Sequence, residues 1–228
     1  MGSRCEQWQF GELPAAPARE KTGVKRRPGA PADCGDNQAP IHTIGLGKPQ
    51  AFFMSSTSNF EVRPATLRDA KAIAEIHVSA SQAAYHGLLT DEQINTVSAE
   101  QRQAYWREAI EFNEPQVYVA IDDGEVVGFV GFDRSRDPGT PPTTGEIWAI
   151  FAATSHWGRG VGLALWDAAR DGLLEEGCTK VTLWVPLGNE RALRFHELAG
   201  FKRELSSAKT VPLGAGKIEE IRLKRELS

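Results

Sequence analysis

Residues 149–170, AIFAATSHWGRGVGLALWDAAR, carry the strongest structural signal in the chain. They pass from an apolar, β-rich segment through Gly158, Gly160 and Gly162 into a segment with helical periodicity. Such a turn directs several backbone N–H groups, at the positive end of the helix dipole, towards one point. Because glycine lets a diphosphate approach the backbone closely, the stretch predicts a phosphate-binding turn with Arg159 as a charged contact. A plain tight turn is the alternative.

Two familiar phosphate-binding loops are excluded by their spacing. The P-loop requires G-x-x-x-x-G-K-[ST], and no Lys-Ser or Lys-Thr pair follows these glycines. The dinucleotide fingerprint G-x-G-x-x-G requires a third glycine, where this chain has Leu163 counted from Gly158 and Leu165 counted from Gly160. Neither of these loops therefore accounts for the turn.

Outward from the turn, the pattern predicts an α/β (α+β mixed) domain over residues 59–228. Capping boxes at Thr66–Asp69 and Ser98–Gln101 predict two helix starts, and Asp123-Gly124 predicts a hairpin turn. The expected order is β-α-α-β-β-β-α-β-α-β-β. The strands are expected at 60–64, 116–122, 125–132, 145–153, 180–185, 201–205 and 217–227, and the helices from 66, from 98, over 161–176 and over 189–198.

Composition limits the remaining possibilities. Residues 1–58 are rich in proline and lack apolar periodicity, so we expect a disordered, dispensable N-terminal extension. The net charge of −4 gives no electrostatic footprint for nucleic acid, and no apolar run is long enough for a membrane span. Cys5, Cys34 and Cys178 lie too far apart for a disulfide framework or a zinc site. We expect a cytoplasmic protein without nucleic acid, membrane or metal partners.

Two motifs resemble those of the GNAT superfamily of acyl-CoA-dependent N-acyltransferases. Gly160 and Gly162 meet the signature [QR]-x-x-G-x-[GA], and NERALRFHELAGF (residues 189–201) is similar to N-x-x-[AS]-x-x-[FL]-[YH]-E-x-x-G-F. The resemblance runs from about residue 60 to the C-terminus. It implies a mostly antiparallel central sheet with splayed parallel strands and flanking helices. It also implies acetyl-CoA (coenzyme A) as acyl donor.

The resemblance assigns coenzyme A to the glycine turn, the strand before it and the start of the later helix. Ile150 and Ala152 would make backbone contacts where two parallel strands splay apart, and Asn189 would bind the cofactor or act only as an N-cap. Trp157 stands where the family usually has Gln or Arg, and Thr154 replaces a common proline. The implied coenzyme A residues are Ile150, Ala152, Trp157, Gly158, Arg159, Gly160, Val161, Gly162, Leu163 and Asn189.

The resemblance also implies two catalytic side chains. Acyl transfer needs a neutral amine, and Glu146 lies where several family members carry a general base, acting directly or through water. Strand alternation puts Glu146, Trp148 and Ile150 on one face, where an apolar surface would raise the pKa of the carboxylate. His196 stands where the family often has a tyrosine acid. The alternatives are a solvated strand-end charge and a helix histidine satisfied by a neighbour such as Glu197.

The acceptor is less well determined by the sequence. Tyr85, His86, Trp106 and Phe132 are candidate substrate contacts, although aromatic residues at helical spacing are more often core. Three functions remain: acetylation of a small-molecule primary amine by direct attack, acetylation of a protein N-terminus or lysine, and acyl-CoA binding without turnover. Homodimers are frequent in the family, so a homodimer is a further possibility.

Overall fold

The described residues of the computed structural model are 60–94, 98–213 and 216–227. They form one sheet in the order β1-β2-β3-β4-β5-β8-β6, with β7 paired to β8. Every pairing in it is antiparallel except the one between β4 and β5. The strands are β1 (Glu61–Pro64), β2 (Gln116–Asp122), β3 (Glu125–Arg134), β4 (Thr144–Ala152), β5 (Lys180–Pro186), β6 (Lys202–Arg203), β7 (Lys209–Leu213) and β8 (Gly216–Glu226).

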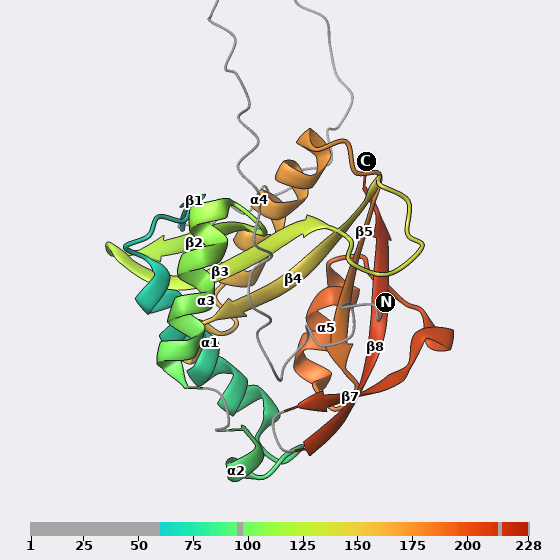
Figure 1. The fold of residues 1–228 in the computed structure, drawn as a ribbon, viewed down its shortest axis with the longest axis horizontal. Coiled ribbons are helices and arrows are strands. Elements are labelled where there is room, and N and C mark those ends of the chain that lie inside the picture. Colours follow the sequence, from blue (N-terminus) through green and yellow to red (C-terminus); the bar gives the residue numbers. More distant parts are fainter. Residues whose placement is uncertain (1–59, 95–97, 214–215, 228) are drawn as a thin grey trace, which may run out of the picture. The chain divides into compact units, whose positions relative to one another are not determined.

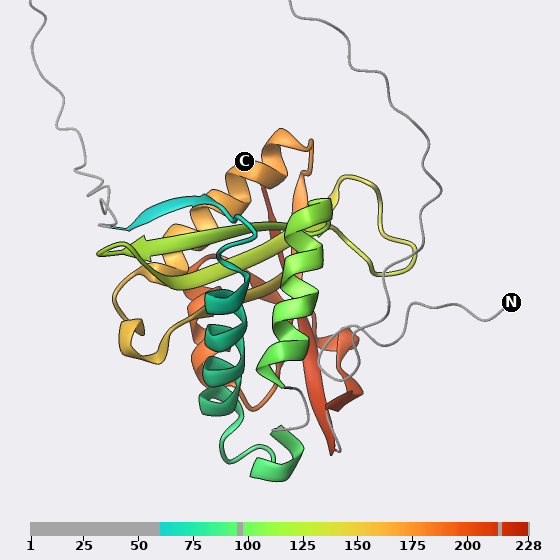
Figure 2. The same ribbon diagram turned by 60° about the vertical axis from the view of Figure 1, so that its left-hand side comes forward.

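The helices cover both faces of the sheet (Figures 1 and 2). On one face, α1 and α3 enclose an apolar cluster that includes Trp106 and Phe129. On the other face, α4 and α5 enclose a second cluster that includes Leu165 and Leu193. The mixed α/β fold and the mostly antiparallel sheet are therefore confirmed. The helices are α1 (Ala70–Tyr85), α2 (Asp91–Ile94), α3 (Ala99–Phe112), α4 (Val161–Glu175) and α5 (Glu190–Leu198), with short 3-10 turns η1 (Thr154–His156) and η2 (Leu205–Ser207).

The sheet opens between its two parallel strands. β4 and β5 pair only where residues 144–146 face residues 180–182. Beyond that point β4 stays paired with β3, and β5 stays paired with β8, so the two strands diverge (Figure 1). The expected splay of parallel strands is confirmed, and it leaves backbone groups on both strand edges without a ladder partner.

A bulge in β4 changes which side chains share a face. Ile147 lies opposite Phe132 and Ala149 lies opposite Gly131, so Trp148 is an extra residue in β4. After this bulge Ile150 packs against the α4 cluster, whereas Ala149 packs against the α1–α3 cluster. The predicted common face of Glu146, Trp148 and Ile150 is therefore wrong for Ile150, because strict alternation fails at a bulge.

The predicted hairpin turn and one of the two predicted helix starts are confirmed, and the other helix start is wrong. The capping box of Ser98 and Gln101 is present at the start of α3, and Asp123 and Gly124 adopt positive φ angles of 50° and 84° in the β2–β3 turn. The predicted helix start at Thr66 is wrong, since α1 begins at Ala70. The Asp69 carboxylate instead accepts hydrogen bonds from the Thr66 N–H (2.7 Å) and from Arg63 (2.8 Å).

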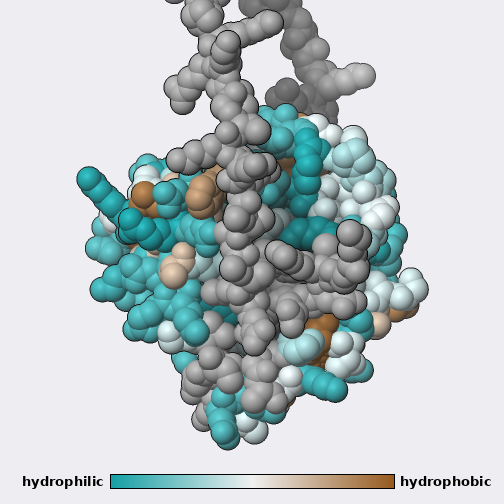
Figure 3. Space-filling view, in the orientation of Figure 1, coloured by the Kyte–Doolittle hydropathy of each residue, from teal (hydrophilic) through white to brown (hydrophobic). Residues whose placement is uncertain are grey.

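Other elements depart from the expected order. The sequence did not predict α2 or β7, and the strand expected over residues 201–205 is reduced to the two residues of β6. The prediction of a dispensable extension over residues 1–58 lies outside the described residues. Within the described part, no helix is long and apolar enough to cross a membrane. Where described residues are visible in Figure 3, that face is mostly hydrophilic with small separate hydrophobic areas.

Candidate active site

The glycine turn, residues 157–162, has the geometry that its sequence predicts. Gly158 and Gly160 have φ angles of 76° and 94°, in the left-handed region that favours glycine. Gly160 is the N-cap residue of α4, and no side chain caps this helix. A Cβ atom added at either glycine would meet no heavy atom of the described residues within 4 Å. The turn is therefore open at both glycines, and no side-chain cap occupies the first N–H groups of α4, as an anion site requires.

Gly162 has a different role in the same turn. A Cβ atom added there would lie 3.2 Å from the Phe195 ring of α5. Gly162 therefore allows close packing of α4 on α5. Phe195 lies in the second half of α5, so this contact joins the first turn of α4 to the later part of α5. The Asn189 side chain accepts a hydrogen bond from the Ala192 N–H (3.1 Å), as an N-cap does.

Trp157 links the end of β4 to α5. Its indole N–H donates a hydrogen bond to the Ala152 carbonyl oxygen (2.9 Å), and the Arg191 guanidinium lies over its ring. The Ala152 carbonyl thus has a partner within the chain. Arg159, whose side chain is 54% exposed, lies 3.4 Å from the Asp122 carboxylate. Arg159 is thus the arginine of the turn itself, and Arg191 of α5 adds a second arginine beside Trp157.

The remaining predicted coenzyme A residues divide between core and surface. Val161 is buried beneath the turn, and Ile150 is partly buried against the same core cluster. Leu163 is exposed on the first turn of α4. Side chains of Val161 and Ile150 are therefore structural, and only their backbone groups remain as candidate ligand contacts.

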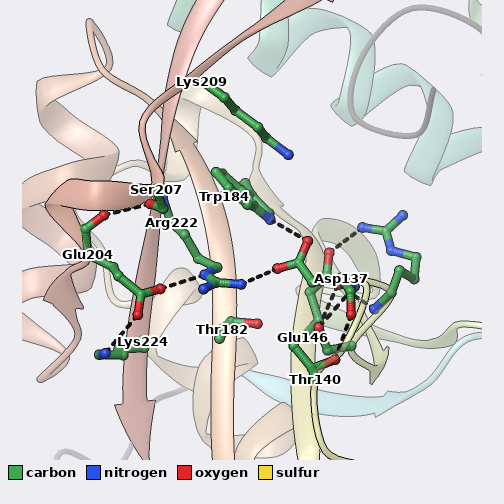
Figure 4. A network of polar contacts seen from close by, with 12 residues as sticks. Asp137, Thr140, Glu146, Thr182, Trp184, Glu204, Ser207, Lys209, Arg222 and Lys224 are labelled. Atoms are coloured by element: carbon green, nitrogen blue, oxygen red, sulfur yellow. Dashed lines mark hydrogen bonds and ion pairs between the residues drawn. The ribbon is translucent and has the colours of Figure 1, made fainter. Parts of the chain in front are cut away.

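Glu146 is held by the segment that joins β3 to β4 (Figure 4). The carboxylate is only 2% exposed, forms an ion pair with Arg136, and accepts the Arg136 backbone N–H (2.9 Å). The Arg136 guanidinium also lies 3.9 Å from the centre of the Trp148 ring. Glu146 is thus a fixed carboxylate on the α1–α3 side of the sheet, beside the line where β4 and β5 separate.

A polar network extends from this point across β5 and β8 (Figure 4). Asp137 accepts hydrogen bonds from the Trp184 indole (3.2 Å) and from Arg222 (2.8 Å), and Arg222 also bonds Glu204 (2.6 Å). Asp137 and Arg222 are 85 positions apart in the chain. No local sequence signal joins them, and sequence reasoning missed this network. We use the name polar network for Arg136, Asp137, Glu146, Trp184, Glu204, Lys209, Arg222 and Lys224.

Glu220, on β8, is a second buried carboxylate that sequence reasoning missed. It is fully buried, and this burial raises the pKa of its carboxyl group to about 7. The ammonium of Lys209 lies 3.4 Å away and opposes that shift. Lys209 also lies 3.6 Å from the centre of the Trp184 ring. Glu220 therefore adjoins the polar network on the same face of the sheet.

His196 lies on the opposite face of the sheet from Glu146. It is 5% exposed and packs edge-on against Phe195 (4.9 Å between ring centres) and Phe201 (5.5 Å). Burial lowers the pKa of His196 to about 4, so the imidazole is neutral at pH 7. A neutral imidazole donates a hydrogen bond, but it lacks the positive charge of an imidazolium acid.

The predicted acceptor contacts do not come together. Phe132 is fully buried against Tyr118 and α4, and Trp106 is buried where its indole N–H bonds the His77 ring (3.0 Å). Both predictions are corrected: these residues are core. Tyr85 is buried at the end of α1, and His86 is exposed as the C-cap residue of that helix. Among the described residues, no group of three or more His, Cys, Asp or Glu side chains is arranged to hold a metal ion.

Comparison with known proteins agrees with this geometry. Residues 82–201 match the acetyltransferase (GNAT) family. An uncharacterised N-acetyltransferase, YuaI of Bacillus subtilis, is 31% identical over 127 residues, which cover 54% of this chain and 70% of that protein. A mycothiol acetyltransferase of Kocuria rhizophila is 33% identical over 82 residues, 36% of this chain and only 27% of that protein.

Solved structures show the same fold. Salmonella typhimurium yncA, a putative acetyltransferase with its cofactor acetyl-CoA, superposes with a TM-score of 0.58 at 24% identity, over 75% of this chain and 95% of that one. The paiA N-acetyltransferase of Thermoplasma acidophilum, in complex with coenzyme A, gives a TM-score of 0.60 at 16% identity over 74% and 99%. The family match over residues 82–201 and the similarity to YuaI identify an acyltransferase. The chain belongs to the GNAT acetyltransferase family.

Proposed function

We propose that this protein transfers an acetyl group from acetyl-CoA to the primary amine of a small molecule. The observation that carries the proposal is the uncapped N-terminus of α4, opened by Gly158 and Gly160, beside the gap between β4 and β5. The turn offers backbone donors and Arg159 to a diphosphate, and Arg191 of α5 lies beside it at Trp157. Structures of yncA and paiA with acetyl-CoA or coenzyme A support the same choice of donor.

The residues around the gap fit a thioester donor. When bound, acetyl-CoA supplies an acetyl group activated as a thioester. The unpaired edges of β4 and β5 offer backbone groups to an extended ligand arm lying between them. Ile150 and Ala152 lie on this part of β4, and the oxyanion of acyl transfer would be met by one of its N–H groups.

Proton transfer is assigned to Glu146. The acceptor arrives mainly as an ammonium ion, and Glu146 takes its proton directly or through water, so that the nitrogen lone pair is free to attack. The new C–N bond replaces the C–S bond, and the products are an N-acetylated amine and free coenzyme A. The ion pair with Arg136 and the hydrogen bond from the Arg136 backbone N–H hold the carboxylate in one orientation.

His196 is assigned to the leaving group. Because its pKa is lowered to about 4, His196 is neutral and acts by donating a hydrogen bond to the departing sulfur. The nitrogen loses a second proton once the C–N bond has formed, and this proton reaches the thiolate through solvent. This assignment places base and donor on the two opposite faces of the opened sheet.

The test is release of free thiol from acetyl-CoA in the presence of a panel of primary amines, with the acetylated product identified by mass. Thiol release that depends on one amine, with one acetyl group added to it, supports the proposal. Release onto peptide N-termini or lysines alone would support a protein acetyltransferase. Tight acetyl-CoA binding without thiol release across both panels would instead indicate a non-catalytic acyl-CoA-binding domain.

A further inference from the structure

Helix α1 bridges the gap between β4 and β5 on the α1–α3 side of the sheet. At His77 it packs against Phe151 of β4, with 4.7 Å between ring centres. Two helical turns later, Tyr85 packs against Ile218 of β8, beyond β5 in the sheet order. The segment of α1 between these contacts therefore lies over the opening, where the proposed transfer takes place.

Ser81 is the polar residue at the centre of this segment. It lies one turn from His77 and one turn from Tyr85, on the same stripe of the helix. Its hydroxyl oxygen is buried and has no hydrogen-bond partner among the described residues. A buried hydroxyl without a partner is costly, so this position is suited to a bound polar ligand.

Arg102 of α3 lies beside this segment. The helices are antiparallel neighbours: Trp106 of α3 bonds His77 of α1, and Arg102, one turn before Trp106, interacts with Tyr85, two turns after His77. Arg102 interacts electrostatically with the phenol groups of Tyr105 and Tyr85. Burial lowers the pKa of its guanidinium. In the part of the chain that the structure describes, the Arg102 guanidinium makes no ion pair or hydrogen bond; only the Arg102 backbone N–H is bonded, to the Ser98 carbonyl oxygen.

Carboxylates occupy the opposite, sheet side of the same opening. Glu146 lies on β4, and Glu220 lies on β8 on the same face as Ile218. Glu220 interacts electrostatically with Tyr85, as does Arg102. The opening is thus bordered by the Arg102 guanidinium on its helix side. On its sheet side lie the Glu146 and Glu220 carboxylates with their partners Arg136 and Lys209.

We propose that the acceptor is a primary amine that also carries an anionic group, such as a carboxylate, and that Arg102 and the Ser81 hydroxyl bind this group. The inference rests on the proposed function. A guanidinium binds a carboxylate or phosphonate through two parallel hydrogen bonds, and a bound anion gives Arg102 the partner it lacks within the described chain. The ammonium end of such an acceptor then faces the carboxylates and the thioester gap.

The experiment compares matched acceptors with the full chain at saturating acetyl-CoA. The panel consists of α-amino acids, their carboxamides and aminoalkylphosphonates, and free thiol is measured. We expect kcat/KM for an amino acid to exceed that for its carboxamide by about 10- to 100-fold, the size of a charge-assisted contact. The phosphonates show which anion is preferred.

The Arg102→Gln variant should abolish this preference, mainly by raising KM for the anionic acceptor. Arg102→Lys should keep part of it. Arg107→Gln, an exposed arginine of the same helix, is the matched control and should leave the preference unchanged. Acetyl-CoA affinity, measured by calorimetry, should be the same in all three variants.

The failures are distinguishable. If wild-type protein does not bind acetyl-CoA, the proposed function fails. If it binds acetyl-CoA and acetylates carboxamides as well as acids, or acetylates none of the panel, the anionic-acceptor inference is overturned. An Arg102→Gln variant that loses kcat equally on acids and amides would show a structural role instead.

Discussion

The glycine turn and the polar network lie on two sides of one opening in the sheet, and they are built differently. The turn uses backbone groups of six consecutive residues, 157–162, positioned by left-handed glycines and the start of α4. The polar network uses side chains of β4, β5 and β8 and of the segments between strands, including a pair 85 positions apart. In the proposed function, the coenzyme that the family shares binds local backbone groups, and the acceptor particular to this protein binds dispersed side chains.

The largest expected effect is on the network side, at Glu146. Glu146→Gln keeps the shape but cannot accept the proton, so we expect turnover to fall by about 10²- to 10⁴-fold with acetyl-CoA affinity unchanged. Steady-state thiol release and calorimetry measure the two quantities. Arg136→Gln is the companion variant, since it removes the ion pair but keeps the carboxylate. Equal losses in the two variants would contradict a proton-accepting role for Glu146.

Glu220 gives a stability effect of known sign. Its pKa is raised from 4.5 to about 7, so between these pH values the folded chain holds a proton that the unfolded chain has released. Its contribution to stability is fully present below pH 4.5 and is lost as pH rises through 7, by up to about 3 kcal/mol. The Glu220→Gln variant has no carboxyl group at this position, so its stability lacks this pH dependence.

The stability of Glu220→Gln relative to wild type should therefore increase from pH 4.5 to pH 8. Denaturant unfolding of both proteins at several pH values measures this difference. A difference that does not change with pH would show that the Glu220 carboxyl titrates normally in the folded protein.

A smaller effect is expected on the turn side, at Arg159. Its side chain is largely exposed, so Arg159→Glu reverses a charge beside the α4 N-terminus without altering the glycines. We expect the Kd for acetyl-CoA to rise about tenfold, with less effect at high salt. Lys71→Glu, an exposed site on α1, is the control. An unchanged Kd in the Arg159 variant would remove that side chain from the phosphate site.

The smallest effect concerns the link between β4 and the turn. Trp157→Phe removes the indole N–H that bonds the Ala152 carbonyl. We expect the free energy of unfolding to fall by about 0.5–1.5 kcal/mol, the net value of one hydrogen bond. Chemical denaturation measures it. A variant as stable as wild type would show that the hydrogen bond does not contribute.

The sequence predicted features built from neighbouring residues, such as the glycine turn, better than features built from distant residues, such as the polar network. The glycine turn, the capping box at Ser98 and the hairpin at Asp123 are local patterns, and each has the conformation expected of it. The pattern at Thr66 did not predict the helix start, since α1 begins at Ala70. The Asp69 carboxylate accepts hydrogen bonds from both Thr66 and Arg63, and the bond from Arg63 lowers the pKa of Asp69 to about 2.

The candidate site beyond the turn depends on tertiary structure. The bulge at Trp148 breaks the alternation from which the face of Ile150 was predicted, and no residue in the strand signals it. Glu220 belongs to a charged run, KIEEIRLKRE, that resembles a solvated strand until β7 and α1 cover it. Arg102 becomes notable only because no carboxylate of the described chain pairs with it.

The most direct test is calorimetric titration of acetyl-CoA into wild-type protein, Gly160→Glu and Arg102→Gln, each first shown to unfold cooperatively. We expect wild type and Arg102→Gln to bind with the same affinity, and Gly160→Glu, which places bulk and negative charge in the open space at the turn, not to bind. No binding by wild type, or undiminished binding by a folded Gly160→Glu variant, would contradict the assignment of the coenzyme to the glycine turn.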